Sequence, residues 1–173
     1  MTFQEIYTLY KDLVFNVSLH YIQNVEEAEE ITQDVFVSVF NNLNNFKSQS
    51  SIKTWLYRIT VNKSIDYLKA KKRKKRWSIF TPLQTNQEKE QLHFANFNHP
   101  GVEMEQKEAT RHIFNCINKL PQNQKTVIIL LKIEQMSQLE VAKILDISSK
   151  AVDSLFQRAK KNLTFLLNQT EGK

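Results

Sequence analysis

Two clusters of charged side chains are dense enough to carry chemistry, and the first is acidic. The stretch EEAEEITQD at 26–34 puts Glu27, Glu30 and Asp34 on one face of a predicted helix, which raises a metal site or an acid-base pair. A di-metal site in a helical bundle needs Glu-x-x-His pairs, and no glutamate of this acidic stretch is followed by a histidine at that spacing. No glycine-rich phosphate loop or nucleophile motif occurs either. We therefore expect no catalysis, no metal and no cofactor.

The acidic cluster has a second interpretation as a docking surface for another protein. Phe36 and Phe40 lie beside it in the sequence, and Val37 adds apolar surface that a single core contact does not require. Aromatic side chains next to a charged rim are typical of protein–protein interfaces. The stretch therefore favours binding of a protein partner over chemistry.

The second cluster is basic. The stretch KAKKRKKR at 69–76 has seven cations in eight residues. Like charges this close repel one another, and bound phosphates relieve the repulsion. A solvated helix end or a nuclear-localisation signal would also account for the run. We favour a nucleic-acid partner and predict a phosphate-binding set of Lys69, Lys71, Lys72, Arg73, Lys74, Lys75 and Arg76.

Aromatic residues precede this run and alternate with cations. Phe46, Trp55 and Tyr57 lie among Lys47, Lys53 and Arg58. Aromatic rings interleaved with cations suit unstacked bases, and each stacked base contributes about 1–3 kcal/mol to binding. A plain core position explains Trp55 equally well. The segment is thus a candidate site for single-stranded nucleic acid.

The stretch SQLEVAKILDISSKAVDSLFQRAKKNL at 137–163 predicts two helices joined by a sharp turn. Ser137 and Glu140 match a capping box, and Ser148 can cap the second helix. In that helix Val152 and Phe156 begin one narrow apolar stripe, which Ala159 and Leu163 continue. The opposite side is polar and basic, as suits base edges and phosphates. An ordinary helical hairpin with a solvated outer face is the alternative. The predicted DNA-binding residues are Ser149, Lys150, Ser154, Gln157, Arg158 and Lys161.

Composition predicts an all-α protein with two small helical domains joined by a linker. The chain has 173 residues with only two glycines and three prolines, too few for many hairpin turns. Net charge is +4 over residues 1–76, −3 over 77–106 and +5 over 107–173. Two basic domains therefore flank an acidic linker, and the basic domains indicate a polyanionic partner.

Apolar periodicity predicts helices over about 3–22, 24–42, 52–74, 102–119 and 122–133, ahead of the pair at 137–163. Asn24 matches a helix cap, and Ser50 or Ser51 can cap the third helix. That helix shows two apolar faces, one with Leu56 and the other with Tyr57. The single cysteine, Cys116, lies among apolar neighbours and is expected to be buried and inert. No signal peptide or membrane span is evident, so we expect a cytosolic protein without membrane insertion.

Three segments in order give the chain a resemblance to bacterial sigma factors of the extracytoplasmic-function group. The first, AEEITQDVFVSVFNNLNNF, looks like the family's segment for docking on core RNA polymerase. The second, FKSQSSIKTWLYRITVNKSIDYLKAKKR, looks like its promoter-melting and minus-ten segment. The stretch from Leu120 to Leu163 looks like the domain that reads the minus-thirty-five element. The resemblance covers nearly the whole chain.

The resemblance implies a function and a set of site residues. The protein would bind core polymerase, direct it to a promoter class and help open the DNA, with a flipped base captured by the loop 46–54. In this family the linker lies in the path of nascent RNA, so an acidic linker would mimic the charge of RNA. Core polymerase would contact Glu30, Gln33, Asp34 and Phe36. Minus-ten DNA would contact Phe46, Lys47, Ser50, Ser51, Thr54, Trp55, Arg58, Asn62, Lys63 and Asp66.

The resemblance also implies partners, and one stretch departs from it. A controlling anti-sigma factor, often membrane-anchored, is expected, and the free protein is expected to be a monomer. The second helix of the hairpin often reads Thr-Val-Lys-Ser-Arg-Leu in the family, whereas here Asp153 and Leu155 replace the two cations. Upstream affinity or specificity should shift accordingly. Two other functions stay open, a duplex-binding regulator that needs no polymerase and a carboxylate-bridged metal enzyme.

Overall fold

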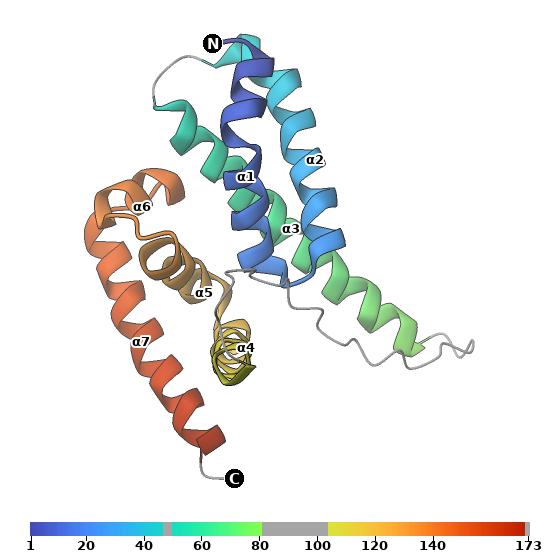
Figure 1. The fold of residues 1–173 in the computed structure, drawn as a ribbon. Helices are drawn as coiled ribbons and strands as arrows, with labels where there is room; N and C mark the ends of the chain where they lie inside the picture. The colour runs from blue at the N-terminus through green and yellow to red at the C-terminus, as the bar shows by residue number, and fades with distance from the viewer. Residues whose placement is uncertain (47–49, 81–103, 172–173) are drawn as a thin grey trace. The chain divides into compact units, whose positions relative to one another are not determined.

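The computed structural model describes residues 1–46, 50–80 and 104–171, and the side chains within them except those of 77–80, 104–108 and 170–171. The chain divides into two compact units, Met1–Ala95 and Asn96–Lys173, with the boundary inside the acidic connector. Every regular element among these residues is a helix, which confirms the all-α prediction (Figure 1). No described helix is long and apolar enough to cross a membrane.

The N-terminal unit packs three long helices against one another (Figure 1). They are α1 (Phe3–Ile22), α2 (Val25–Asn42) and α3 (Ile52–Phe80), with a short 3-10 turn η1 (Leu43–Asn45) after α2. The first two agree with the predicted ranges to within a residue. Their shared core contains Ile6, Val14, Val17, Ala28, Val35, Val39, Leu56 and Val61.

A two-residue link joins α1 and α2. Gln23 adopts the left-handed conformation with φ 61° and closes α1 with a bond from its N–H to the Leu19 carbonyl. Its side-chain amide also donates to the carbonyls of Leu19 and His20, at 3.1 and 3.0 Å. Asn24 then accepts a bond from the Glu27 N–H at 2.8 Å and caps α2. The link therefore sets the antiparallel turn with local hydrogen bonds alone.

Helix α3 differs from its prediction in two ways. It continues to Phe80, beyond the predicted end near Lys74 and into the segment assigned to the linker. It also has one buried face rather than two, and Ile52, Ile59 and Ile65 at the margins are half-exposed. The two-faced prediction was wrong because each residue turns the helix by only about 100°, so Leu56 and Tyr57 are neighbours on one face. The buried stripe consists of Leu56, Tyr57, Thr60, Val61 and Ser64.

The described part of the C-terminal unit, residues 104–171, has four α-helices. They are α4 (Met104–Lys119), α5 (Gln122–Ile128), α6 (Gln138–Leu145) and α7 (Ser149–Glu171). A π-helical segment, η2 (Ile129–Ile133), extends α5. Cys116 is a free, buried thiol, as predicted. The core of this unit contains Phe114, Ile117, Val127, Ile129, Leu130, Val141, Ile144, Val152 and Ala159.

Candidate nucleic-acid and protein-docking surfaces

The turn between α6 and α7 has the geometry of a helix-turn-helix. At the start of α6, Ser137 Oγ accepts from the Glu140 N–H, and Glu140 Oε2 accepts from the Ser137 N–H at 2.9 Å, so the predicted capping box is present. Asp146 ends α6 in the left-handed conformation with φ 55°. Ser148 Oγ then accepts from the Ala151 N–H at 3.1 Å. Caps at both sides of the turn thus determine where each helix stops and starts.

Helix α7 has a buried side and a polar side. Val152 and Ala159 are fully buried, and Phe156 is half-buried. The Nζ atoms of Lys132 and Lys160 lie 5.3 and 4.9 Å from the centre of the Phe156 ring, a pair of cation–π contacts that sequence reasoning missed. Ser149 is half-buried at the start of the helix. The five other predicted DNA-binding side chains are exposed: Lys150, Ser154, Gln157, Arg158 and Lys161.

The outer face of α3 carries four of the ten predicted minus-ten residues, in line with Lys69 of the basic run. Trp55, Arg58, Asn62, Asp66 and Lys69 are spaced three or four residues apart, so they share a face opposite the buried stripe. Arg58, Asn62 and Asp66 are exposed, and Lys69 Nζ lies 3.2 Å from Asp66 Oδ1. Cationic, amide and aromatic side chains therefore lie together on one face of α3, which we call the outer stripe.

The loop before α3 joins this stripe through an aromatic pair. The rings of Phe46 and Trp55 are 4.8 Å apart between centres, and both are half-buried, so Trp55 is neither a core residue nor fully exposed. Ser51 caps α3 by accepting from the Thr54 N–H at 3.0 Å. Ser50 and Lys63 are half-buried. Lys47 lies outside the described residues, as does most of the acidic linker.

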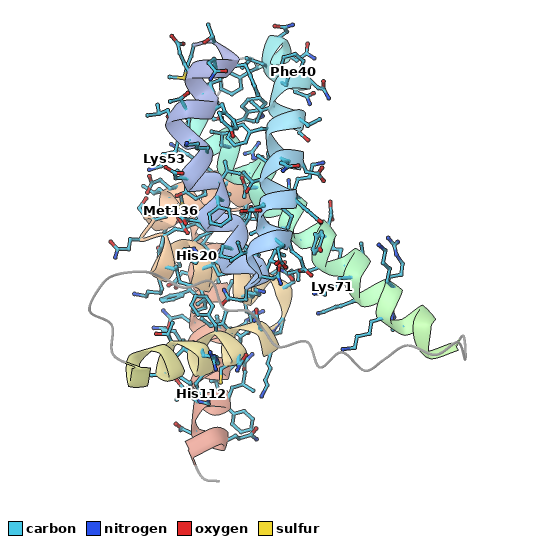
Figure 2. All side chains as sticks on the ribbon, turned by 45° about the vertical axis from the view of Figure 1, so that its right-hand side comes forward. His20, Phe40, Lys53, Lys71, His112 and Met136 are labelled. Carbon is cyan, nitrogen blue, oxygen red and sulfur yellow. The ribbon has the colours of Figure 1, made fainter. Side chains whose placement is uncertain are left out.

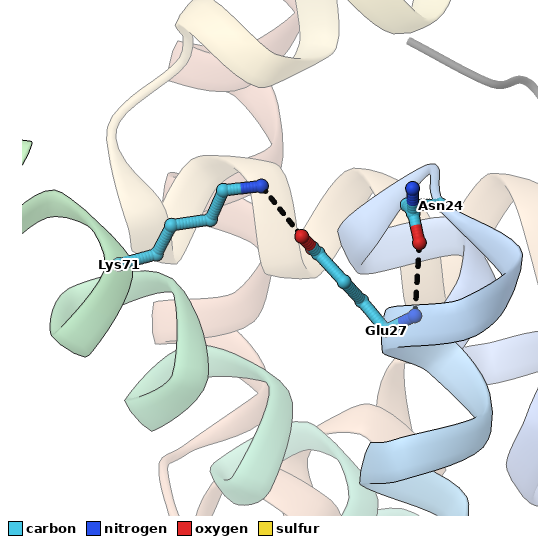
Figure 3. A network of polar contacts seen from close by, with 3 residues as sticks. All are labelled: Asn24, Glu27 and Lys71. Carbon is cyan, nitrogen blue, oxygen red and sulfur yellow. Dashed lines mark hydrogen bonds and ion pairs between the residues drawn. The ribbon is translucent and has the colours of Figure 1, made fainter. Parts of the chain in front are cut away.

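The basic run continues along α3 with one residue set apart. Lys69, Lys72, Arg73, Lys74, Lys75 and Arg76 are exposed. Lys71 instead reaches α2, where its Nζ lies 2.7 Å from Glu27 Oε1 (Figure 3). Glu27 is the same residue whose N–H the Asn24 cap binds. This ion pair ties the start of the basic run to the start of α2, a link that no sequence pattern indicated.

Tyr67 lies close to this ion pair, and the charges of Glu27 and Lys71 both shift the pKa of its phenol. Burial raises the pKa of its phenol above the ordinary value of 10.0, and the negative charges of Glu27 and Glu30 raise the pKa further. Lys71 acts in the opposite direction. The raised pKa of Tyr67 therefore follows from its burial and from the two acidic side chains of α2.

The exposed surface of α2 differs from its prediction at one residue. Glu30, Gln33 and Asp34 are exposed, as a docking surface requires. Phe36 is only 4% exposed, however, and its ring lies 4.8 Å from that of Tyr7. Residues 36 and 40 are four apart on the helix, yet only Phe36 turns inward.

The exposed apolar side chains on this helix are Val37 at 59% and Phe40 at 65%. Figure 2 labels Phe40 on α2. The Phe40 ring lies 5.3 Å from that of Phe3, at the edge of the same aromatic cluster. We define the α2 docking surface as Glu30, Gln33, Asp34, Val37 and Phe40. In the described part of the chain, no three His, Cys, Asp or Glu side chains gather closely enough to share a metal ion.

Together the capped hairpin of α6 and α7, the stripe on α3 and the α2 docking surface belong to an all-helical protein of the helix-turn-helix class. Two family models match the chain, sigma-70 region 2 over residues 6–74 and sigma-70 region 4 over residues 111–163. A probable RNA polymerase sigma factor of Haemophilus influenzae is 31% identical over 157 residues, covering 86% of this chain and 80% of the relative. The chain therefore belongs to the sigma-70 family of bacterial RNA polymerase sigma factors, in the extracytoplasmic-function group.

Further relatives agree with this membership. The ECF RNA polymerase sigma factor SigW of Bacillus subtilis is 29% identical over 165 residues, covering 93% of this chain and 86% of SigW. The sigma factor RpoE of Bartonella quintana, solved with the anti-sigma factor NepR, has a similar fold with a TM-score of 0.71 at 18% identity, over 96% of each chain. CnrH, solved with the cytosolic domain of CnrY, gives 0.65 at 23% identity, over 96% of this chain and 88% of CnrH.

Family membership decides between the functions that the sequence left open. Sigma factors are initiation factors without catalytic activity, and they direct RNA polymerase to promoters. The prediction of an alternative sigma factor is confirmed. The stand-alone regulator and the metal enzyme are both set aside, because neither accounts for a region 2 match over α1, α2 and α3.

Proposed function

We propose that the two units divide promoter recognition between them. Residues 1–76 dock on core polymerase and engage the minus-ten element, and residues 107–173 read the minus-thirty-five element. The acidic linker at 77–106 passes through the path of nascent RNA. Support comes from the family models, which match the two units separately, and from net charges of +4 and +5 on either side of the −3 segment.

Core polymerase docks on the α2 docking surface in this proposal. Glu30, Gln33 and Asp34 supply the polar rim, and Phe40 with Val37 supplies the apolar centre. Phe36 supports this surface from inside the aromatic cluster rather than through direct contact. The arrangement of an exposed aromatic residue beside charged groups is typical of protein interfaces.

Minus-ten DNA engages the outer stripe of α3 and the loop before it. Trp55 and Phe46 offer a stacking platform for a flipped base, which is most accessible in a strand already separated. Arg58, Asn62, Lys63 and Asp66 hold the fork, together with Ser50, Ser51 and Thr54. The basic run then neutralises backbone phosphates, which contributes affinity without reading sequence.

One observation carries the proposal for the upstream element, namely the polar side of α7. Five exposed side chains that can bind bases or phosphates lie opposite fully buried Val152 and Ala159, directly after a capped turn. This is how a recognition helix presents its residues to the major groove. A purely structural hairpin does not require cations and amides to gather on one side.

Regulation by a protein partner and a place in the cell complete the proposal. Two structural neighbours were solved with the anti-sigma factor NepR or with the cytosolic domain of CnrY. We propose that a comparable anti-sigma factor, often membrane-anchored, restrains this chain. The protein itself acts in the cytoplasm, where polymerase and promoters are, and is a monomer when free.

The test is core-dependent transcription from genomic DNA with mapped transcript starts. New starts that share spaced upstream motifs are expected only when the full chain is added to bacterial core polymerase. An Asp34→Lys/Phe40→Ala variant should lose these starts while remaining folded, since both side chains are exposed. Asp12→Lys/Leu9→Ala, the same kind of change on the exposed side of α1, is the matched control. Equal loss in both variants would contradict docking through α2.

A further inference from the structure

The polar side of α7 contains an acidic residue that the proposed function does not use. Asp153 is half-buried at the edge of this side, one helical turn before Gln157. Residues four apart on a helix are neighbours. An acid next to DNA is unfavourable beside phosphates, so its position among Lys150, Arg158 and Lys161 requires a specific role.

Asp153 holds two amide side chains. Gln157 Nε2 donates to Asp153 Oδ1 at 3.2 Å. Gln138 Nε2, from the first turn of α6, approaches the same oxygen at 3.5 Å, the outer limit for a hydrogen bond. A carboxylate only accepts, so the Gln157 amide must turn its NH2 group toward Asp153. That leaves the amide oxygen and one N–H for a base edge.

Ser154 also offers hydrogen-bond acceptors on this side of α7. Its hydroxyl donates to the Lys150 carbonyl at 3.0 Å, so the lone pairs of Oγ remain for a partner. Asp153 keeps acceptor positions beyond the two amides, because a carboxylate has about four. Around Asp153, Ser154 and Gln157 acceptors therefore outnumber donors. The cations at 150, 158 and 161 supply the donors to either side.

We infer that Asp153 is a specificity-determining residue that makes α7 select a base with an amino group in the major groove. Cytosine presents N4 and adenine presents N6 as donors there, whereas guanine presents only acceptors at N7 and O6. At the position that Asp153 and Gln157 contact, α7 is expected to prefer cytosine, then adenine, and to disfavour guanine. This inference rests on the proposed function, in which α7 enters the major groove of the upstream element.

The test is base selection by holoenzyme assembled from bacterial core polymerase and the full chain. Promoter DNA randomised through the upstream element is bound and sequenced, and starts are mapped in the same sample. The wild type should enrich cytosine over guanine about tenfold at one upstream position. Asp153→Lys, which places donors there, should reverse the preference by a similar factor. Asp153→Asn removes the charge and should reduce the preference to about threefold.

The control is Asp12→Lys, which makes the same change of charge on exposed α1 and should leave the upstream preference as in the wild type. Base preferences in Asp153→Lys that equal those of the wild type would overturn the inference, even if overall affinity changed. Should Asp153→Lys fail to fold, an unchanged preference in Asp153→Asn would overturn it as well. Core-dependent starts without any upstream preference in the wild type would overturn the reading role of α7 itself, and the inference with it.

Discussion

The two helices that we propose to bind nucleic acid, α3 and α7, differ in how their charged residues are distributed. The distal part of α3 has seven cations in eight residues, whereas on α7 Lys150, Arg158 and Lys161 are separated by Ser154, Gln157 and Asp153. Dense cations release counterions from any phosphate backbone, and polar side chains between cations contact base edges. In the proposed function, this difference means that phosphate binding and base recognition are separate properties that belong to different units.

The supports of the two surfaces differ as well. Glu27 of α2 holds Lys71, so an ion pair within the N-terminal unit withdraws one cation of the run from solvent and anchors this part of α3 (Figure 3). On α7 the polar side is oriented by the Ser148 cap and by the buried stripe beneath it. A surface that binds only backbone phosphates does not need precisely oriented side chains, whereas a surface that recognises base edges needs a rigid helix.

The largest expected effect comes from breaking the support of α7. Val152 is fully buried, so Val152→Asp places an unpaired charge in the core and should reduce the free energy of unfolding by about 3–4 kcal/mol. Thermal unfolding measured by circular dichroism checks this. Ser154→Asp, an exposed change of the same charge, should alter the melting temperature little. Similar melting of both variants would contradict the burial of this stripe.

Weakening the grip of α3 should have the next largest effect. Lys74→Gln/Arg76→Gln removes two exposed cations and should reduce affinity for every promoter alike, by about tenfold at moderate salt. The slope of log affinity against log salt should become shallower by ~0.7–0.9 for each phosphate that the variant no longer neutralises. Lys11→Gln/Lys119→Gln, which removes two exposed cations elsewhere, is the matched control. The same slope change in both variants would show that only net charge matters.

A single substitution on the polar side of α7 should have a smaller effect, which falls on base preference rather than on overall affinity. Gln157→Ala should cost about 1 kcal/mol on the preferred upstream base and almost nothing on other bases, because the amide is exposed and its removal affects base recognition alone. Competition binding of holoenzyme to single-base promoter variants measures this. Asn168→Ala, which removes an exposed amide near the end of α7, serves as the control. A uniform decrease in affinity across all promoter variants would assign Gln157 to the DNA backbone instead.

The smallest effect concerns Tyr67 and the ion pair between Lys71 of α3 and Glu27 of α2. One of the five tyrosines, Tyr67, should ionise above pH 10.0 in an absorbance titration, and Tyr67→Phe should remove that component. Glu27→Gln should move it down only in part, since burial is the larger cause. Because folding raises the pKa of Tyr67, its neutral phenol contributes to the stability of the folded state. This contribution is present below pH 10.0 and is lost as the pH rises through the folded-state pKa. A Tyr67 midpoint unaffected by Glu27→Gln would contradict the contact.

Much of the fold follows from the sequence because its signals are local. Helix caps were predicted correctly at Asn24, Ser137 and Ser148, and the structure selects Ser51 from the two serines predicted for α3, since a cap is a bond between residues two or three apart. Of the apolar stripe predicted for α7, Val152 and Ala159 are fully buried, and Phe156 and Leu163 are half-buried. The order of the segments was enough to indicate the family. Local hydrogen bonding and helical periodicity thus determine which residues are helical and which side of α7 is polar.

Only the tertiary structure decided how residues far apart in the chain pair. It turned Phe36 into the cluster with Phe3 and Tyr7 and left Phe40 at the surface, although both are phenylalanines on one helix. It paired Lys71 with Glu27 across 44 residues and brought Gln138 to Asp153. Sequence spacing states which residues share a helix face, but burial of a face depends on which other helix covers it. That choice is a property of packing, and packing is decided by the whole unit.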